Sequence, residues 1–193
     1  LVPIMSSLEG NIIVIPQGSA LPQHDFYCYL LSLPHLFGTE LSSIPARPNY
    51  LTAPASKVEA WEKRLAPYQK KRIGIVWSGG YRAERPELWS VNSRRNIPFK
   101  TMAQLIDDRA DWFSLQKGEP AESEFADYLS SPDRPINLIN LTSELGDFSD
   151  TAAFIENLDL VITVDTSTAH LAAALGKPTW MLNRFDTDWR WML

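Results

Sequence analysis

The stretch LDLVITVDTSTAHLAAALGKPTWML, residues 158–182, decides the fold. Its apolar, β-branched run at residues 160–164 is typical of a strand buried on both faces in a parallel sheet. Asp165 follows as the expected N-cap of a helix over residues 166–175. A glycine and a proline then end the helix before a further strand at residues 179–182. The stretch therefore predicts a strand, a tight turn, a helix and a second strand.

The same alternation extends upstream. Strands are predicted at residues 73–77, 112–115 and 136–139, and helices at residues 56–68, 98–106, 121–129 and 151–157. Ser56 and Glu59 have the spacing of a capping box. Residues 81–96 and 142–150 are expected to be loops. Strands that alternate with helices indicate right-handed βαβ units, so the predicted class is α/β, a Rossmann-like doubly wound parallel sheet.

The amino-terminal part has a different pattern. Residues 1–8 are expected to end a helix, and residues 12–15 to form a short strand. Several prolines and little periodicity follow at residues 38–54, which is typical of a connection between domains. We therefore expect residues 1–52 to be a remnant of a preceding Rossmann-like domain with its linker, and residues 53–193 to form a second domain that is truncated at its end.

Composition narrows the class of protein. The chain has 193 residues, of which 45% are hydrophobic and 21% charged, with a formal net charge of −5. This balance is typical of a globular protein and shows no basic field for nucleic acid. The single Cys28 is interpreted as a small apolar side chain and excludes an intrachain disulfide. No apolar run has the length of a membrane span. The expected location is cytoplasmic, with peripheral attachment to the inner membrane as an alternative.

Polar side chains follow three of the predicted strands. Because parallel strands end at the same edge of a sheet, these side chains are expected to meet there. Glycines let backbone amides approach a ligand, cationic side chains attract an anion, and a helix start offers amides and hydroxyls. Together they suit a diphosphate, although neither a Walker loop nor a dinucleotide fingerprint occurs. The candidate binding residues are Ser78, Gly79, Arg95, Lys117, Asp165, Thr166, Ser167 and His170.

Each of these residues also has a purely structural interpretation. Asp165 can be a helix cap, His170 a half-buried histidine and Lys117 a solvated surface lysine. The tryptophans at positions 180, 189 and 191 are interpreted as core rather than as a sugar platform. Convergence at one sheet edge favours the binding interpretation, but it does not identify the ligand.

At this point the residues resemble a known family. The run DTSTAHLAAALGKP at residues 165–178 resembles the DTGxxHLAAALGxP signature of family 9 glycosyltransferases, the ADP-heptose–lipopolysaccharide heptosyltransferase family. IGIVW at residues 73–77, SLQKG at residues 114–118 and DWRW at residues 188–191 are similar to a branch in which the domain follows tetratricopeptide repeats in bacterial proteins. The resemblance covers nearly the whole chain in order.

The resemblance implies a GT-B fold, of which this chain is the carboxy-terminal half that binds a nucleotide diphosphate sugar as donor. It places Asp165, Thr166, Ser167 and His170 at the diphosphate and sugar, and Lys117 at the nucleotide. It implies no bound metal and no other cofactor, because helix amides and basic side chains stabilise the leaving diphosphate. The acceptor is expected to be a saccharide or a protein. The catalytic residue that activates it is expected in the amino-terminal domain, so this fragment alone is expected to be inactive. The resemblance also implies that a base could lie near the helix that follows Asp147 and Phe148.

Ser167 stands where the family signature has glycine, so heptose is not implied as the donor sugar. Three functions remain open. The first is sugar transfer from a nucleotide diphosphate sugar. The second is a non-catalytic GT-B-like scaffold or binding module attached to tetratricopeptide repeats. The third is a nucleotide-sugar epimerase of similar form.

Overall fold

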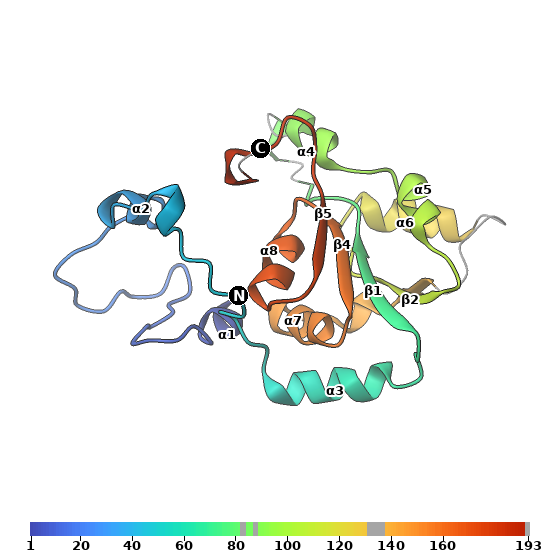
Figure 1. Cartoon of the computed structure of the whole chain (residues 1–193), viewed down its shortest axis with the longest axis horizontal. Helices are drawn as coiled ribbons and strands as arrows, with labels where there is room; N and C mark the ends of the chain where they lie inside the picture. The colour runs from blue at the N-terminus through green and yellow to red at the C-terminus, as the bar shows by residue number, and fades with distance from the viewer. Residues whose placement is uncertain (82–83, 87–88, 131–137, 192–193) are drawn as a thin grey trace.

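The centre of the molecule is a five-stranded sheet. The structure of the chain is a computed structural model, and it describes residues 1–81, 84–86, 89–130 and 138–191 (Figure 1). The strands are β1 (Lys71–Val76), β2 (Ala110–Ser114), β3 (Leu138–Asn140), β4 (Leu160–Val164) and β5 (Thr179–Leu182). Their order is β3-β2-β1-β4-β5, and every neighbouring pair is parallel. This is the doubly wound order, so the predicted Rossmann-like α/β class is confirmed.

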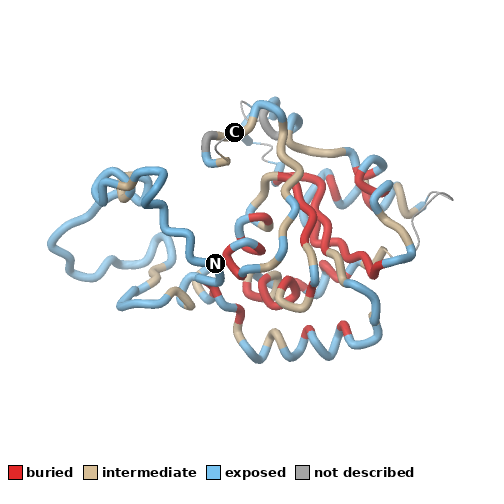
Figure 2. The backbone as a smooth tube through the Cα atoms, in the orientation of Figure 1, coloured by how far each residue is buried: buried red, intermediate tan, exposed pale blue. Residues whose placement is uncertain are grey.

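Helices cover both faces of the sheet. The α-helices of the described residues are α1 (Val2–Met5), α2 (Leu33–Leu36), α3 (Ala55–Leu65), α4 (Trp89–Arg95), α5 (Phe99–Met102), α6 (Ala121–Leu129), α7 (Phe148–Glu156) and α8 (Ser167–Ala174), of which α2 lies on the amino-terminal part, away from the sheet (Figure 1). Side chains that alternate along the strands form two cores. Val76 and Val161 pack with α1, α3, α7 and α8, whereas Ile75 and Ile162 pack with α5 and α6. Figure 2 shows these buried strands and helices at the middle of the molecule.

The sheet reverses its direction of winding between β1 and β4. The chain leaves β1 for β2 and β3 on one side, then returns to β4 and β5 on the other. The loops that follow β1 and β4 therefore run in opposite directions, which leaves a crevice beyond the carboxyl ends of these two strands. The predicted strand at residues 136–139 is found as β3; residues 136 and 137 lie outside the described residues.

Three local predictions are wrong. Residues 81–96 are not only a loop, because they contain α4. Helix α7 begins at Phe148 rather than at residue 151, because Asp147 caps it three residues earlier. The capping box of Ser56 does not form: Pro54 is the N-cap residue and carries no side-chain hydrogen bond, so Ser56 already lies within the first turn of α3.

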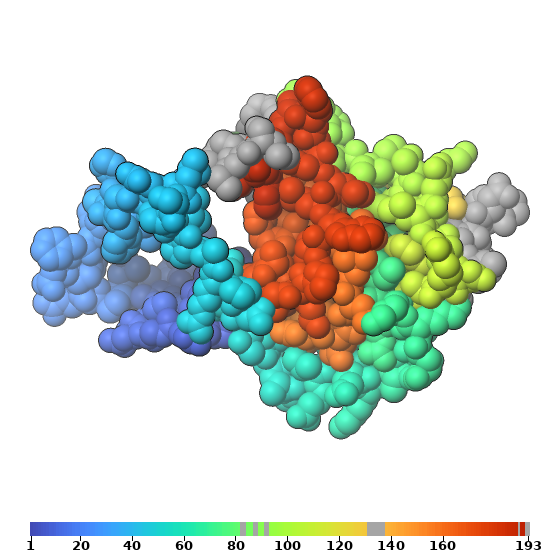
Figure 3. Space-filling model, in the orientation of Figure 1, coloured from blue at the N-terminus to red at the C-terminus, as the bar shows by residue number. Residues whose placement is uncertain are grey.

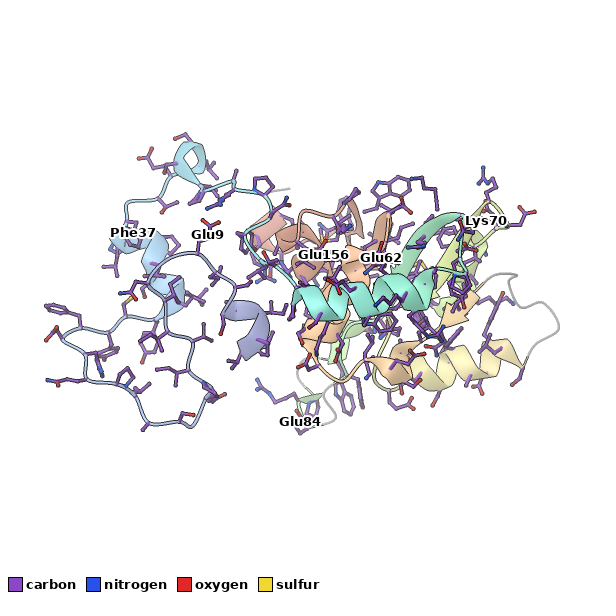
Figure 4. All side chains as sticks on the ribbon, turned by 90° about the horizontal axis from the view of Figure 1, so that it is seen from below. Glu9, Phe37, Glu62, Lys70, Glu84 and Glu156 are labelled. Carbon is purple, nitrogen blue, oxygen red and sulfur yellow. The ribbon has the colours of Figure 1, made fainter. Side chains whose placement is uncertain are left out.

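The predicted strand at residues 12–15 is also absent: these residues are not in a strand, and Ile13 is 76% exposed. Figure 3 shows that this amino-terminal part of the chain projects from the body. Figure 4 shows Glu9 and Phe37 on the projection, away from Glu62 on α3. An ion pair joins the two ends of the projection, with Nη1 of Arg47 and Oε2 of Glu9 2.7 Å apart. Helix α1 nevertheless joins the body, because Ile4 is 1% exposed within the core of α3 and α7. Among the described residues, no helix is long and apolar enough to cross a membrane.

Candidate functional site

A cavity of about 600 Å³ lies where the doubly wound topology places a ligand, beyond the carboxyl ends of β1, β2 and β4. It is bounded by the turns that follow these strands, by the last residues of α4 and by the first turns of α7 and α8. Its lining residues are Val76, Ser78, Gly79, Gly80, Arg95, Leu115, Gln116, Lys117, Phe148, Thr151, Thr166, Ser167 and Thr168. Six of the eight predicted binding residues are among them.

The turn after β1 is fixed by two side-chain amides. The Oε1 atom of Gln116 accepts hydrogen bonds from the amides of Trp77 and Ser78, at 3.2 and 2.9 Å. The Oδ1 atom of Asn96 accepts one from the amide of Gly79, at 2.9 Å. A buried backbone amide without a partner would be costly, so these bonds hold the turn in one conformation. They present Gly79 to the cavity as a rigid wall.

The guanidinium of Arg95 packs closely against Gly79. A Cβ atom at this position would lie 2.5 Å from both Nε and Nη2 of Arg95. The Nη1 atom of Arg95 donates a hydrogen bond of 3.2 Å to the carbonyl of Asp165, at the end of β4. Arg95 therefore bridges the turns after β1 and β4, and its charge lies on the cavity wall.

Lys117 provides the second positive charge. Its ammonium donates a hydrogen bond of 2.7 Å to the carbonyl of Leu145, just before α7. An ammonium carries three hydrogens, so two are left for a ligand. The described lining residues include Arg95 and Lys117 and no carboxylate. Two cations without a carboxylate make this a site for an anion.

The start of α8 completes the anion site. Thr166, Ser167 and Thr168 line the cavity at the N-terminus of α8. No side chain caps this end, because the hydroxyl of Thr166 lies 3.1 Å from the hydroxyl of Thr163 instead. The first amides of a helix have no acceptor within the helix, and the helix dipole favours negative charge there. The hydroxyls and amides of this turn therefore suit phosphate oxygens.

Asp165 and His170 do not line this cavity. The prediction that Asp165 caps α8 is wrong, since Thr166 occupies the N-cap position. The carboxylate of Asp165 instead lies 3.8 Å from Nε2 of His170. The half-exposed ring of His170 stacks on Trp191, with centroids 5.2 Å apart. His170 lies one helical turn after Ser167, and neither Asp165 nor His170 is among the residues that line the cavity.

The tryptophans predicted to be core differ from one another. Trp180 is 63% exposed, so the core prediction is wrong there, because β5 is an edge strand with one face toward solvent. Trp191 is half-buried through its contact with His170. The side chain of Trp189 lies outside the described residues.

The region of Asp147 is a structural cap rather than an available base. Its carboxylate accepts hydrogen bonds from the hydroxyl of Ser149 at 2.5 Å and from the amides of Ser149 and Asp150. These bonds, with that of Lys57, hold the pKa of Asp147 far below its usual value. A carboxylate with so low a pKa is a weak proton acceptor. Asp147 is not among the lining residues of the cavity, but its neighbours Phe148 and Thr151 are.

Sequence reasoning gave no role to Asn96, Gln116 or Thr151. The sequence places Gln116 at the end of a strand. Its two hydrogen bonds to the turn after β1 form only because β2 pairs with β1 in the sheet. Asn96 and Thr151 belong to segments whose boundaries were mispredicted, and no local pattern marks them. The described residues contain no group of three or more histidine, cysteine, aspartate or glutamate side chains placed to hold a metal.

The comparisons with known proteins agree with this geometry. Residues 99–183 match the model of glycosyltransferase family 9 (heptosyltransferase). The structure of E. coli ADP-heptose lps heptosyltransferase II is similar, with a TM-score of 0.51 and 15% sequence identity. The similarity covers 72% of this chain and 41% of that chain, so the present chain spans about two fifths of the length of that enzyme. No curated protein sequence matches the chain.

The matched region contains part of the site. Residues 99–183 include Lys117, the start of α7 and the whole of α8. The structural match confirms the Rossmann-like fold of a GT-B heptosyltransferase. The resemblance to this family noted in the sequence is thus confirmed as a similarity over residues 99–183, which match the model of glycosyltransferase family 9 (heptosyltransferase), whereas the link to tetratricopeptide repeats stays a prediction.

Proposed function

We propose that this chain is the donor-binding part of a glycosyltransferase that uses a nucleotide diphosphate sugar. The observation that carries the proposal is the carboxylate-free cavity at the β1–β4 switch point, with Arg95, Lys117 and the start of α8 in its wall. A diphosphate is the ligand whose charge and size match two cations and a helix N-terminus. The family match supports a sugar nucleotide rather than another diphosphate.

The proposed reaction develops negative charge on the diphosphate. The bond from the anomeric carbon to the diphosphate oxygen breaks, and a bond to the acceptor oxygen forms. Lys117 and Arg95 stabilise the charge that the leaving oxygen gains, together with the first amides of α8. The acceptor is a saccharide or a protein, and its proton passes to a base that we expect outside the donor-binding part. We also propose that the domain follows tetratricopeptide repeats in the whole protein and that the protein acts in the cytoplasm.

Binding to the 193-residue chain tests the proposal. Isothermal titration with ADP, UDP and GDP, each the leaving group of a donor, should show saturable binding to one of them. Inorganic pyrophosphate serves as a probe without a base. Lys117→Ala should weaken binding about 10-fold or more, because a hydrogen bond to a charged group contributes about 1.5–3 kcal/mol.

A matched variant controls for a general loss of charge. Lys63→Ala removes an exposed lysine of α3 that is not among the lining residues, and it should leave the affinity unchanged. If none of the three nucleotides and no pyrophosphate binds to the folded chain, the proposed function is wrong. Equal losses in the two variants would show a non-specific attraction rather than a site.

A further inference from the structure

Lys57 lies outside the cavity, yet it contacts the helix that forms part of the wall. From the first turn of α3, its ammonium reaches Oδ1 of Asp150 at 2.7 Å, Oγ of Ser149 at 2.7 Å and Oδ1 of Asp147 at 3.3 Å. All three partners belong to the N-terminus of α7. Both carboxylates raise the pKa of Lys57, Asp150 most strongly, so the lysine stays protonated.

The partners of Lys57 fix the backbone that enters the cavity wall. Asp147 accepts hydrogen bonds from the amides of Ser149 and Asp150, and Asp150 accepts from the amides of Gly146 and Asp147 in return. This reciprocal arrangement is a capping box. Phe148 lies within it and lines the cavity, as does Thr151, one residue beyond it.

The same turn also holds a cation of the anion site. Lys117 donates its hydrogen bond to the carbonyl of Leu145, directly before the box. A displacement of the turn would therefore change the position of Lys117 as well as that of the wall. The box also places two carboxylates, Asp147 and Asp150, beside a cavity that suits an anion. Without a cation nearby, their charge would oppose a diphosphate.

We propose that Lys57 is a positioning residue for the donor diphosphate. It holds the α7 cap in place and neutralises its carboxylates, although it does not touch the ligand. The proposal rests on the proposed function for the identity of the ligand, but not for the position of the cap. It differs from the role of Lys117, whose ammonium lies on the cavity wall.

Two variants of Lys57 separate charge from packing. Lys57→Gln keeps most of the side-chain length but removes the charge, and it should weaken the affinity for the nucleoside diphosphate about 3- to 10-fold. Lys57→Arg keeps the charge and should restore the affinity to within about 2-fold of the original chain. Thermal melting monitored by circular dichroism identifies any variant that fails to fold.

Lys71→Gln is the matched control. Lys71 forms a lysine–aspartate pair of the same 2.7 Å length with Asp159, at the opposite end of β1 from the cavity. Its loss removes a more exposed lysine–aspartate pair away from the cavity and should leave the affinity unchanged. Equal affinities of Lys57→Gln and the original chain would overturn the positioning role while leaving the proposed function intact.

A measurement without ligand distinguishes the two proposals. Amide hydrogen exchange should become faster at residues 148–151 in Lys57→Gln than in Lys71→Gln, because the cap loses its cation. If the original chain binds no nucleoside diphosphate, the proposed function fails and the positioning role toward that ligand fails with it, whereas exchange still decides whether Lys57 holds the α7 cap. Unchanged exchange at residues 148–151 would overturn that role in either case.

Discussion

At the residue scale, one added methyl group at Gly79 is predicted to disturb the site, because Arg95 packs against this glycine. In Gly79→Ala the new methyl group would meet the guanidinium of Arg95 at 2.5 Å, so the guanidinium must move off the wall. Affinity for the nucleoside diphosphate should fall about 10-fold, as expected when one charge-assisted hydrogen bond is lost. Isothermal titration measures the change.

The neighbouring glycine provides the control. A Cβ atom on Gly80 meets nothing within 4 Å, and Gly80 lines the same cavity. Gly80→Ala should therefore bind with nearly the original affinity. A loss of equal size in both variants would mean that the turn needs glycine for its backbone and not for the approach of Arg95.

The residues that sequence reasoning found share one physical origin. Parallel strands end at one edge, so Ser78 and Lys117 are brought together by topology alone. The role of Asp165 depends on a one-residue shift in where α8 begins. Asp165 and Thr166 are both good cap residues, and the hydrogen-bonding partners of the surrounding fold decide between them.

At the element scale, α7 should make the free energy of unfolding depend on pH through its cap. The hydrogen bond from the Ser149 hydroxyl holds the pKa of Asp147 in the folded chain below its value in the unfolded chain, which is about 4, so its contribution to stability is fully present above that pH and decreases as the pH falls. In Asp147→Asn this contribution is missing. The difference in unfolding free energy between the two chains should be largest near neutral pH and should shrink toward about pH 2.5.

Urea unfolding at several pH values measures this difference. Comparing the two chains at each pH removes the contribution of the other carboxylates, such as Glu144 and Asp159, whose pKa values are also lowered. A difference that stays constant from pH 7 to about pH 2.5 would contradict the ionised cap. In Asp147→Asn we expect α7 to stay packed on α3, because the side-chain amide of Asn157 still donates a hydrogen bond to the carbonyl of Val58.

The elements themselves were predicted with uneven success. Strands β4 and β5 and helix α6 have the predicted bounds, because apolar runs and breaker residues define them locally. The start of α7 was missed because its cap, Asp147, lies in a polar run with several candidate cap residues. The start of α3 was missed because Pro54 sets the entry of the helix before Ser56.

At the scale of the whole molecule, the body and the projecting amino-terminal part should differ in resistance to proteolysis. Phe26, Tyr27 and Tyr29 are 92%, 80% and 75% exposed, whereas Phe113 and Phe154 are fully buried. Brief chymotrypsin treatment should therefore cut first at the exposed aromatics, because backbone with few packed contacts opens at low cost. Mass spectrometry identifies the first cut. A first cut at Phe113 or Phe154 would contradict the fold.

The alternation of strands and helices predicted the class of the whole molecule, but it did not determine the strand order. The order depends on which face each helix covers, and that choice is made by long-range packing such as the stack of Trp61 on Phe154, with centroids 4.3 Å apart. Residues 12–15 have a strand-like composition, but they pair with no strand of the part of the chain that the structure describes.

The central claim is that the β1–β4 crevice binds a diphosphate, and a crystal structure of the 193-residue chain with a bound nucleoside diphosphate tests it most directly. We predict that the phosphates lie between Arg95 and Lys117, within hydrogen-bonding distance of the first turn of α8. Phosphates found elsewhere on the molecule, with this cavity holding only solvent, would contradict it.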